Sequence, residues 1–306
     1  MVGCRHGGGQ RRQARPRIAR ARRRGEETPA LVPVSQTALR GATDLRIPSG
    51  AAPDHEHRVL DLTAERAGWK YVGFEVVRLL GGEPLARDTG EREACFVWLG
   101  GTSSVIAGQK RWERVGKRAT VFDGAPHALH VGPGTSVRVS AGKKGCEIAI
   151  GWAPATESVD PALYKHAAVE ERGEGAAART IHQILMEDRA AQRLLVTEVL
   201  TPAGHWSSYP PHKHDTDDPP NESYLEETYY FRMKDPRGFA LQRVYTSDRS
   251  LDESLVARDG DVVLVPRGYH TVSAAPGYDL YYLNVMAGPR REWKITFDPD
   301  HERMRW

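Results

Sequence analysis

Short apolar runs repeat along the chain from about residue 43 onward, and glycine or proline punctuates the gaps between them. The runs are rich in Val, Ile and aromatic residues, which favour strands. Their spacing of about one run per ten residues is typical of an antiparallel sandwich or barrel. In the first half of the chain these predicted strands lie at 72–80, 93–101, 103–108, 119–124, 135–142 and 146–153.

A second set of strand-like runs follows the first after a change of pattern. Between residues 169 and 193, Ile181, Ile184 and Leu185 have helical spacing, which predicts one helix in a linker. The two sets share their rhythm rather than visible sequence identity, so two all-β barrels in tandem are predicted. The second set of predicted strands lies at 193–202, 226–233, 238–246, 261–266, 270–276 and 279–288.

These patterns divide the chain of 306 residues into three predicted parts. An Arg-rich extension occupies 1–42, an N-terminal barrel occupies 43–168, and a C-terminal barrel occupies 169–306. We expect the extension to be disordered, because it lacks the apolar surface that would offset its ordering entropy. The alternatives for this extension are nucleic-acid binding, an organellar transit peptide and extra translated sequence.

Charge and cysteine content narrow the class of protein. Nine arginines and no acidic residue lie within residues 1–25; removing these nine charges from the net charge of +3 leaves the rest at −6. A mildly acidic body does not indicate a nucleic-acid partner. No run approaches the roughly 20 apolar residues of a membrane span. The cysteines, of which Cys95 and Cys146 are expected to be buried, form no CxxC pair and favour a reducing compartment, here the cytoplasm.

The strongest chemical signal is a pair of histidines one residue apart. If the segment is extended, as Pro210 and Pro211 favour, His212 and His214 project to one face, and Lys213 projects to the other. A third metal ligand is expected from an acidic residue nearby. The candidates are Glu222, Glu226 and Glu227; the last two open a predicted strand, so one of them should face inward.

A fourth ligand is His270, which follows a predicted strand and a tight turn in "VPRGYH". Three imidazoles and one carboxylate suit Zn²⁺, Fe²⁺, Mn²⁺ or Ni²⁺. In the first half, His127 and His130 lack a neighbouring His-x-His or a matching Glu. We therefore expect these two to be structural and the first barrel to be metal-free.

The second half of the chain contains five characteristic motifs: "GHWSSYPPHKHD", "YLEETYYFRM", "GFALQRVYT", "DVVLVPRGYH" and "GYDLYYLNVMAGP". Together they resemble the family of 5-deoxy-glucuronate isomerases of myo-inositol catabolism, a group that also contains 5-keto-4-deoxyuronate isomerases. The resemblance implies a bicupin, that is, two tandem cupin barrels of the double-stranded β-helix or jelly-roll type. It also implies a divalent metal ion (Zn, Mn or Fe) held by His212, His214, Glu227 and His270.

The reaction implied by the resemblance is an aldose–ketose isomerisation of 5-deoxy-D-glucuronate to 5-dehydro-2-deoxy-D-gluconate, without a redox cofactor. The sequence offers Tyr229, Tyr282, Lys213 and Arg243 as general acid, base or binding groups. For the substrate carboxylate, Arg243 is the first candidate and Arg267 the second.

Other functions remain as alternatives at this point. They are another uronate isomerase such as 5-keto-4-deoxyuronate isomerase, a metal-dependent cupin dioxygenase, and a sugar-binding cupin without turnover. The expected partner is a small-molecule sugar acid. No membrane or nucleic-acid partner is expected, and a homo-oligomer is left open.

Overall fold

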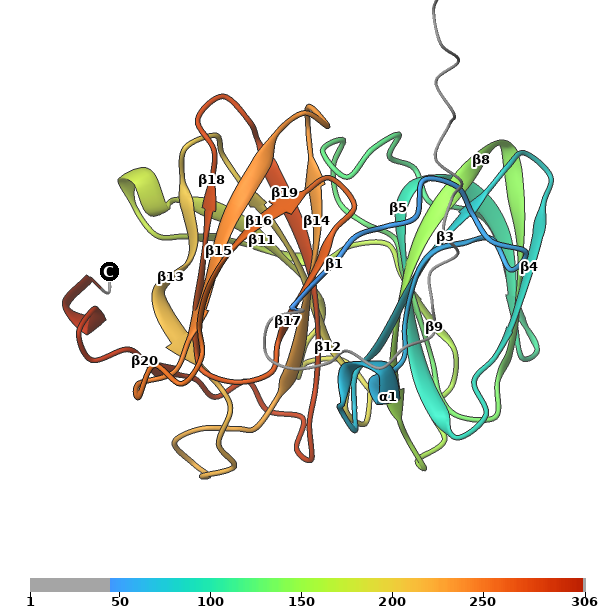
Figure 1. Cartoon of the computed structure of the whole chain (residues 1–306). Helices are drawn as coiled ribbons and strands as arrows, with labels where there is room; N and C mark the ends of the chain where they lie inside the picture. Colours follow the sequence, from blue (N-terminus) through green and yellow to red (C-terminus); the bar gives the residue numbers. More distant parts are fainter. Residues whose placement is uncertain (1–44, 305–306) are drawn as a thin grey trace, which may run out of the picture. The chain divides into compact units, whose positions relative to one another are not determined.

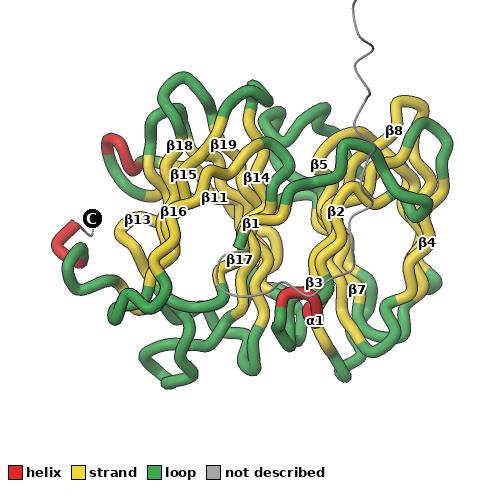
Figure 2. Tube along the Cα trace, viewed as in Figure 1, coloured by secondary structure: helices red, strands yellow, loops and turns green. Residues whose placement is uncertain are grey.

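This computed structural model describes residues 45–304, so the predicted Arg-rich extension at 1–42 lies outside the described residues. The described chain is almost entirely strands and turns (Figures 1 and 2), and the predicted all-β class is confirmed. Every strand pair is antiparallel. The helical elements are short: α1 (Ala64–Ala67), η1 (Gly175–Ala177) and η2 (Glu302–Met304), the last two being 3₁₀ turns.

One sheet of eight strands forms the first half, in the order β2-β3-β8-β5-β7-β9, with β4 on β8 and β6 on β5. Two of its strands, β5 and β8, are 16 and 19 residues long, and their register shifts near Gly101 let them bend. At this bend Gly101 has φ +80, and a Cβ there would lie 2.3 Å from the Gly145 carbonyl oxygen, so only glycine fits. The strands are β2 (Arg58–Leu62), β3 (Gly73–Leu79), β4 (Pro84–Asp88), β5 (Arg92–Ala107), β6 (Lys110–Val115), β7 (Ala128–Val131), β8 (Ser136–Pro154) and β9 (Ala162–Tyr164).

Two sheets form the second half (Figure 1). One has the order β1-β17-β14-β19-β12-β11-β10 and the other β16-β15-β18-β13-β20. Strand β1 falls within the range predicted for the first barrel, yet it pairs with β17. The strands are β1 (Arg46–Ile47), β10 (Ala168–Arg172), β11 (Arg179–Leu185), β12 (Leu195–Thr201), β13 (Trp206–Lys213), β14 (Glu226–Met233), β15 (Phe239–Tyr245), β16 (Asp252–Arg258), β17 (Val262–Val265), β18 (Tyr269–Ala274), β19 (Leu280–Ala287) and β20 (Thr296–Phe297).

The helix predicted around Ile181 is wrong, because these residues form strand β11 between β10 and β12. A register shift between Gln183 and Leu185 interrupts the alternation of the strand. Ile184 and Leu185 are consequently both buried. A bulged strand can therefore show the apolar spacing of a helix.

An apolar core continues from the first half into the second. It includes Phe74 and Val97 of the first half and Tyr230 and Val285 of the second, all fully or almost fully buried. The rings of Phe74 and Tyr230 are 5.7 Å apart between centroids. Burial of large aromatic side chains is a major stabilising contribution, so the two halves support each other. The predicted burial of Cys95 and Cys146 is also confirmed.

Each half also holds the other through one buried carboxylate. Glu93, at the start of β5, accepts hydrogen bonds from the three consecutive backbone N–H groups of residues 192–194, at 2.6–2.8 Å. Its other neighbour is the Nε2 of His130 at 3.0 Å. In the reverse direction Glu226, at the start of β14, accepts from the three N–H groups of residues 70–72 at 2.8–2.9 Å. Buried N–H groups need such partners, so both carboxylates stabilise the junction of the two halves.

Glu93→Gln should lower the free energy of unfolding by about 2–4 kcal/mol, because the amide NH₂ would face donors that need an acceptor. Burial alone would raise the pKa of Glu93, but His130 and the N–H groups outweigh burial and lower it. This contribution is therefore complete above the ordinary pKa of about 4.3 and is lost as pH falls through the lower folded pKa. Thermal denaturation at a series of pH values should show that the difference in melting temperature between Glu93→Gln and wild type shrinks as pH falls.

Glu113→Gln is the matched control, because this carboxylate is more than half exposed and pairs with one exposed arginine. Its melting temperature should stay within about 1 °C of wild type. Equal melting temperatures for Glu93→Gln and Glu113→Gln would contradict the role given to Glu93.

Candidate functional site

Three buried histidines meet inside the second half. His212 lies near the end of β13 and pairs in register with His270 of β18, so the two side chains share the inner face. His214 follows two residues after His212, and the His214 and His270 ring centroids are 5.2 Å apart. One ligand atom from each of the three lies within 4.8 Å of the others. The structure thus brings together the three histidines that the sequence predicted.

Glu227 reaches the same point from β14 in the opposite sheet. Its Oε2 lies 3.0 Å from Nε2 of His214 and 3.2 Å from Nε2 of His270. Glu226, the preceding residue, points the other way to the first half of the chain. Strand alternation thus places one of the two acids inside, as expected. We call His212, His214, Glu227 and His270 the four-residue cluster.

Hydrogen bonds made by the four-residue cluster decide which imidazole nitrogens can bind a divalent cation. The carbonyl oxygens of Leu225 and Gly268 lie 3.0 and 3.4 Å from Nδ1 of His214 and His270, respectively. Carbonyl oxygens only accept, so they keep a hydrogen on each Nδ1 and leave Nε2 as the ligand atom. Nε2 of His270 is buried, and its only neighbour of opposite charge among the described residues is Oε2 of Glu227 at 3.2 Å, outside good hydrogen-bond geometry.

The pKa shifts in the cluster follow from burial and from the carboxylate of Glu227. Burial lowers the pKa of His212, and the neighbouring imidazoles of His270 and His214 lower it further, so His212 is neutral. Burial alone would raise the pKa of Glu227, but His214 and His270 outweigh burial and lower it to about 2. Burial alone would lower the pKa of His214, but its hydrogen bond to Glu227 outweighs burial and raises it. A divalent ion would take the place of that proton, because neutral imidazoles and an ionised carboxylate are the forms that bind metal.

Two tyrosines line a small cavity beside the cluster. Tyr229 lies two residues after Glu227 on β14, and Tyr282 lies on the neighbouring strand β19. Both line a cavity of about 50 Å³ together with His212 and Asn284. Burial raises the pKa of both hydroxyls, so they are protonated and act as hydrogen-bond donors rather than bases.

Consecutive serines hold these hydroxyl groups. The Oγ of Ser207 hydrogen-bonds to Tyr282, and the Oγ of Ser208 lies 2.9 Å from the Tyr229 hydroxyl. Neighbouring strand residues normally face opposite sides, but Ser208 has φ 48 and the pairing of β13 with β18 is irregular there. A left-handed φ is unfavourable for serine, and this strained position turns both serines toward the tyrosines.

The predicted cationic groups lie away from the cluster. Nζ of Lys213 is 2.7 Å from Asp215 and 2.8 Å from Glu222, on the outer face of β13, so Glu222 is not a ligand either. Arg243 pairs with Asp252 through two bonds of 2.8 Å. The expectation that Lys213 and Arg243 act at the site is therefore not met.

The outward position of Arg243 follows from the register of β15. Its neighbour Val244 is directly opposite His270 and shares the inner face, so Arg243 must face outward. The second candidate, Arg267, is exposed in the turn before β18.

Arg179, the first residue of β11, was missed by the sequence prediction. It is 6% exposed and lines the inner cavity with Ile181 and Gln183, the alternate residues of the strand. Its guanidinium donates to the carbonyl oxygens of Ala177 at 2.9 Å and Tyr209 at 3.3 Å. The helix expected here concealed the residue, because only strand alternation directs it inward.

A larger depression adjoins the inner cavity. Its volume is about 630 Å³, and its walls include Tyr209, Gly173 and Phe297. Four residues line both spaces and form the neck between them: Arg172, Arg179, His212 and Trp293. His212 of the four-residue cluster therefore borders both the depression and the inner cavity.

Two β-barrel halves define the class of this protein as a bicupin. Within residues 45–304, one candidate metal centre is found, formed by three histidines and a glutamate of the second half. The protein's particular family follows from sequence: the profile of the KduI/IolB family matches residues 45–304, and the chain belongs to that family. The resemblance found in the sequence is thereby confirmed.

Relatives of known name agree with this assignment. The 5-deoxy-glucuronate isomerase of Geobacillus thermodenitrificans is 49% identical over 257 residues, which cover 83% of this chain and 93% of the relative. The protein of the same name from Bacillus subtilis strain 168 is 40% identical, over 80% of this chain and 91% of its own.

Solved structures show the same fold. An IolB-like protein from Salmonella typhimurium is 41% identical, with a TM-score of 0.82 over 85% of this chain and 99% of its own. The oxalate decarboxylase of Lactobacillus farciminis, at 13% identity and a TM-score of 0.61 over 85% and 90% of the chains, shares the fold alone. In the described part of the chain, no helix has the length and apolar character needed to cross a membrane.

Proposed function

We propose that this protein is a 5-deoxy-glucuronate isomerase that interconverts 5-deoxy-D-glucuronate and 5-dehydro-2-deoxy-D-gluconate in the degradation of myo-inositol. The observation that carries the proposal is the 49% identity to a protein of that name over 93% of its length. The buried four-residue cluster supports it chemically, because the conversion of an aldehyde to a ketone needs a polarised carbonyl.

The reaction balances without an oxidant or a second substrate. A hydrogen leaves C2 and returns on C1, while the hydroxyl proton of O2 is lost and O1 gains one. A divalent ion (Zn, Mn or Fe) held by His212, His214, Glu227 and His270 would act as a Lewis acid on the carbonyl and the adjacent hydroxyl.

The protein's own groups complete the site. The protonated hydroxyls of Tyr229 and Tyr282 can donate hydrogen bonds to O1 and O2, and Ser207 and Ser208 hold them in position. The inner cavity is small, so the aldehyde end of the substrate displaces water on entry. Electrostatic interactions are stronger in such a dry site, which favours the developing negative charge.

Incubation of the purified protein with 5-deoxy-D-glucuronate in oxygen-free buffer tests the proposal. We expect conversion to an equilibrium mixture with the ketone by proton NMR, at the same rate with and without oxygen. A requirement for oxygen would instead indicate the dioxygenase alternative. Binding with an unchanged spectrum over hours would indicate a sugar-binding protein, and faster conversion of 5-keto-4-deoxyuronate would indicate the related isomerase.

A further inference from the structure

Arg179 differs from the other buried arginine of the described chain in having no acidic partner. Two arginines are buried there, Arg118 and Arg179. Arg118 makes two bonds of 2.9 Å to the carboxylate of Glu198. Arg179 contacts carbonyl oxygens, and no carboxylate of the described residues lies within 4.0 Å of it. A buried cation without an anion is costly, so the position calls for an anionic ligand.

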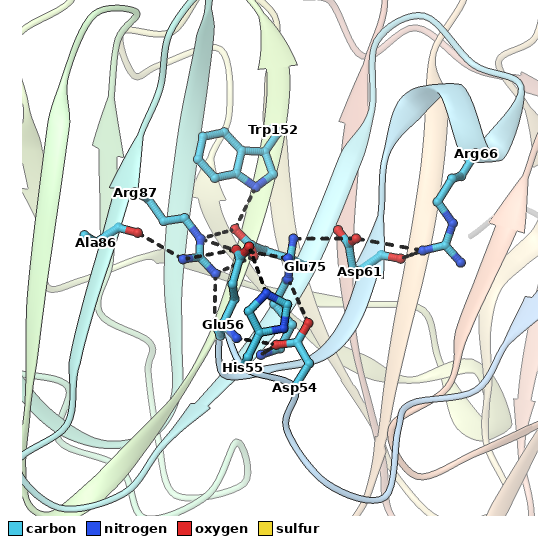
Figure 3. Close-up of polar contacts among 10 residues, drawn as sticks. Asp54, His55, Glu56, Asp61, Arg66, Glu75, Ala86, Arg87 and Trp152 are labelled. Carbon is cyan, nitrogen blue, oxygen red and sulfur yellow. Dashed lines mark hydrogen bonds and ion pairs between the residues drawn. The ribbon is translucent and has the colours of Figure 1, made fainter. Parts of the chain in front are cut away.

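In a polar cluster of the first half, a carboxylate of the protein itself neutralises a poorly exposed arginine. There Arg87 grips the carboxylate of Glu75 through Nε and Nη2 at 3.0 Å, and Trp152 donates to the same carboxylate (Figure 3). Nothing further is needed to neutralise Arg87. Arg179 has the same planar set of donors without the carboxylate that Arg87 finds.

The backbone holds the guanidinium of Arg179 in one place. Gly173 has φ +79, and a Cβ added there would lie 2.7 Å from Nη1 of Arg179. The carbonyl of Ala177 accepts from the same Nη1 at 2.9 Å. Residues 173–177 thus wrap closely around the side chain. Such preorganisation reduces the entropy that a ligand must overcome on binding.

The acidic residues that line the outer depression form no ion pair with Arg179. Glu170 is bound by Arg172 and Gln183, and Glu171 accepts from Thr180. Glu174 also lines the depression, but it forms no ion pair with Arg179 in the described part of the chain. Burial lowers the pKa of Arg179, and the charge of Glu170 opposes this only from beyond ion-pair distance. The ordinary pKa of arginine is so high that Arg179 stays protonated.

We propose that Arg179 binds the carboxylate of the substrate and sets the preference of this site for sugar acids, an inference that rests on the proposed isomerase function. The inner cavity of about 50 Å³ beside His212 has room for the aldehyde end of the chain only. The carboxylate at the other end then lies in the neck, where Arg179 lines both spaces. Arginine suits this task because its fork matches a carboxylate with two parallel bonds.

The test compares Arg179→Gln and Arg179→Lys with wild type on two substrates. The first is 5-deoxy-D-glucuronate; the second is 5-deoxy-D-glucose, in which a hydroxymethyl group replaces the carboxylate. Arg179→Gln should lower kcat/KM for the uronate about 100-fold, mostly through KM, and leave kcat/KM for the neutral sugar unchanged. Arg179→Lys should retain an intermediate preference. Where the neutral sugar is not turned over, its inhibition constant gives the comparison.

Arg189→Gln is the matched control, because Arg189 also donates to backbone carbonyls but lies outside both cavities. It should keep the wild-type preference for the uronate. Calorimetric binding of D-glucuronate and D-glucose to wild type and Arg179→Gln gives a readout without turnover. Unchanged selectivity in Arg179→Gln, or equal losses on both sugars, would overturn the role of Arg179. Wild type that binds the acid through Arg179 but converts no uronate would overturn the proposed function instead.

Discussion

His212→Ala should abolish both metal binding and isomerase activity. The substitution removes one of the four proposed ligands from a buried cluster, and no other imidazole or carboxylate of the described residues is placed to replace it. We expect bound metal to fall from about one per chain to below about 0.1. The loss of Lewis-acid stabilisation, worth several kcal/mol, should lower kcat/KM by at least about 10³-fold. Elemental analysis and proton NMR of the same sample measure both quantities.

The matched control is His55→Ala, because the side chain of His55 is 86% exposed in the first half of the chain. It should leave metal content and kcat/KM unchanged. Retention of near wild-type activity by His212→Ala after its metal has been removed would rule out a metal-assisted reaction. Full metal content with lost activity would mean that His212 acts in some other way.

Tyr229→Phe and Tyr282→Phe should each lower kcat about 100-fold and leave the metal in place. Both hydroxyls line the inner cavity, and burial keeps them protonated by raising their pKa. A positioned donor of this kind typically contributes about 10²–10⁴-fold to a proton-transfer reaction. The measurement is steady-state turnover of 5-deoxy-D-glucuronate, with metal content determined for each variant.

Tyr245→Phe controls for the loss of a buried tyrosine hydroxyl. The hydroxyl of Tyr245 donates to Asp298 at 2.5 Å and lies outside the inner cavity. This variant should be less stable, with kcat within a few-fold of wild type. If Tyr229→Phe and Tyr282→Phe both kept wild-type kcat, neither hydroxyl could take part in the chemistry.

Much of the four-residue cluster could be predicted from sequence because strand alternation relates residues that are close together in the chain. Side chains two apart in a strand share a face, so His212 and His214 could be paired without knowledge of the fold. The same alternation left one of Glu226 and Glu227 facing inward, and the family resemblance favoured Glu227. The turn before His270 was recognisable from its glycine and proline.

The remaining features depend on register and backbone geometry, which the sequence does not encode locally. Arg243 was expected at the site, but its inward or outward direction is set by pairing with β18. Arg179 was hidden because the bulge in β11 imitates helical spacing. The roles of Ser207 and Ser208 depend on the left-handed φ of Ser208, which no sequence pattern indicated.

The most direct test of a metal-dependent isomerase is proton NMR in D₂O with three samples of the full chain: as purified, stripped of metal, and stripped then reloaded with Zn²⁺, Mn²⁺ or Fe²⁺. With 5-deoxy-D-glucuronate, the first sample should form the ketone, the second should be inactive, and at least one reloaded sample should recover. Deuterium on C1 of the product would indicate an enediol route, and its absence a hydride shift. Equal conversion by the stripped sample would contradict the metal dependence, and no conversion by any sample would contradict the proposed function.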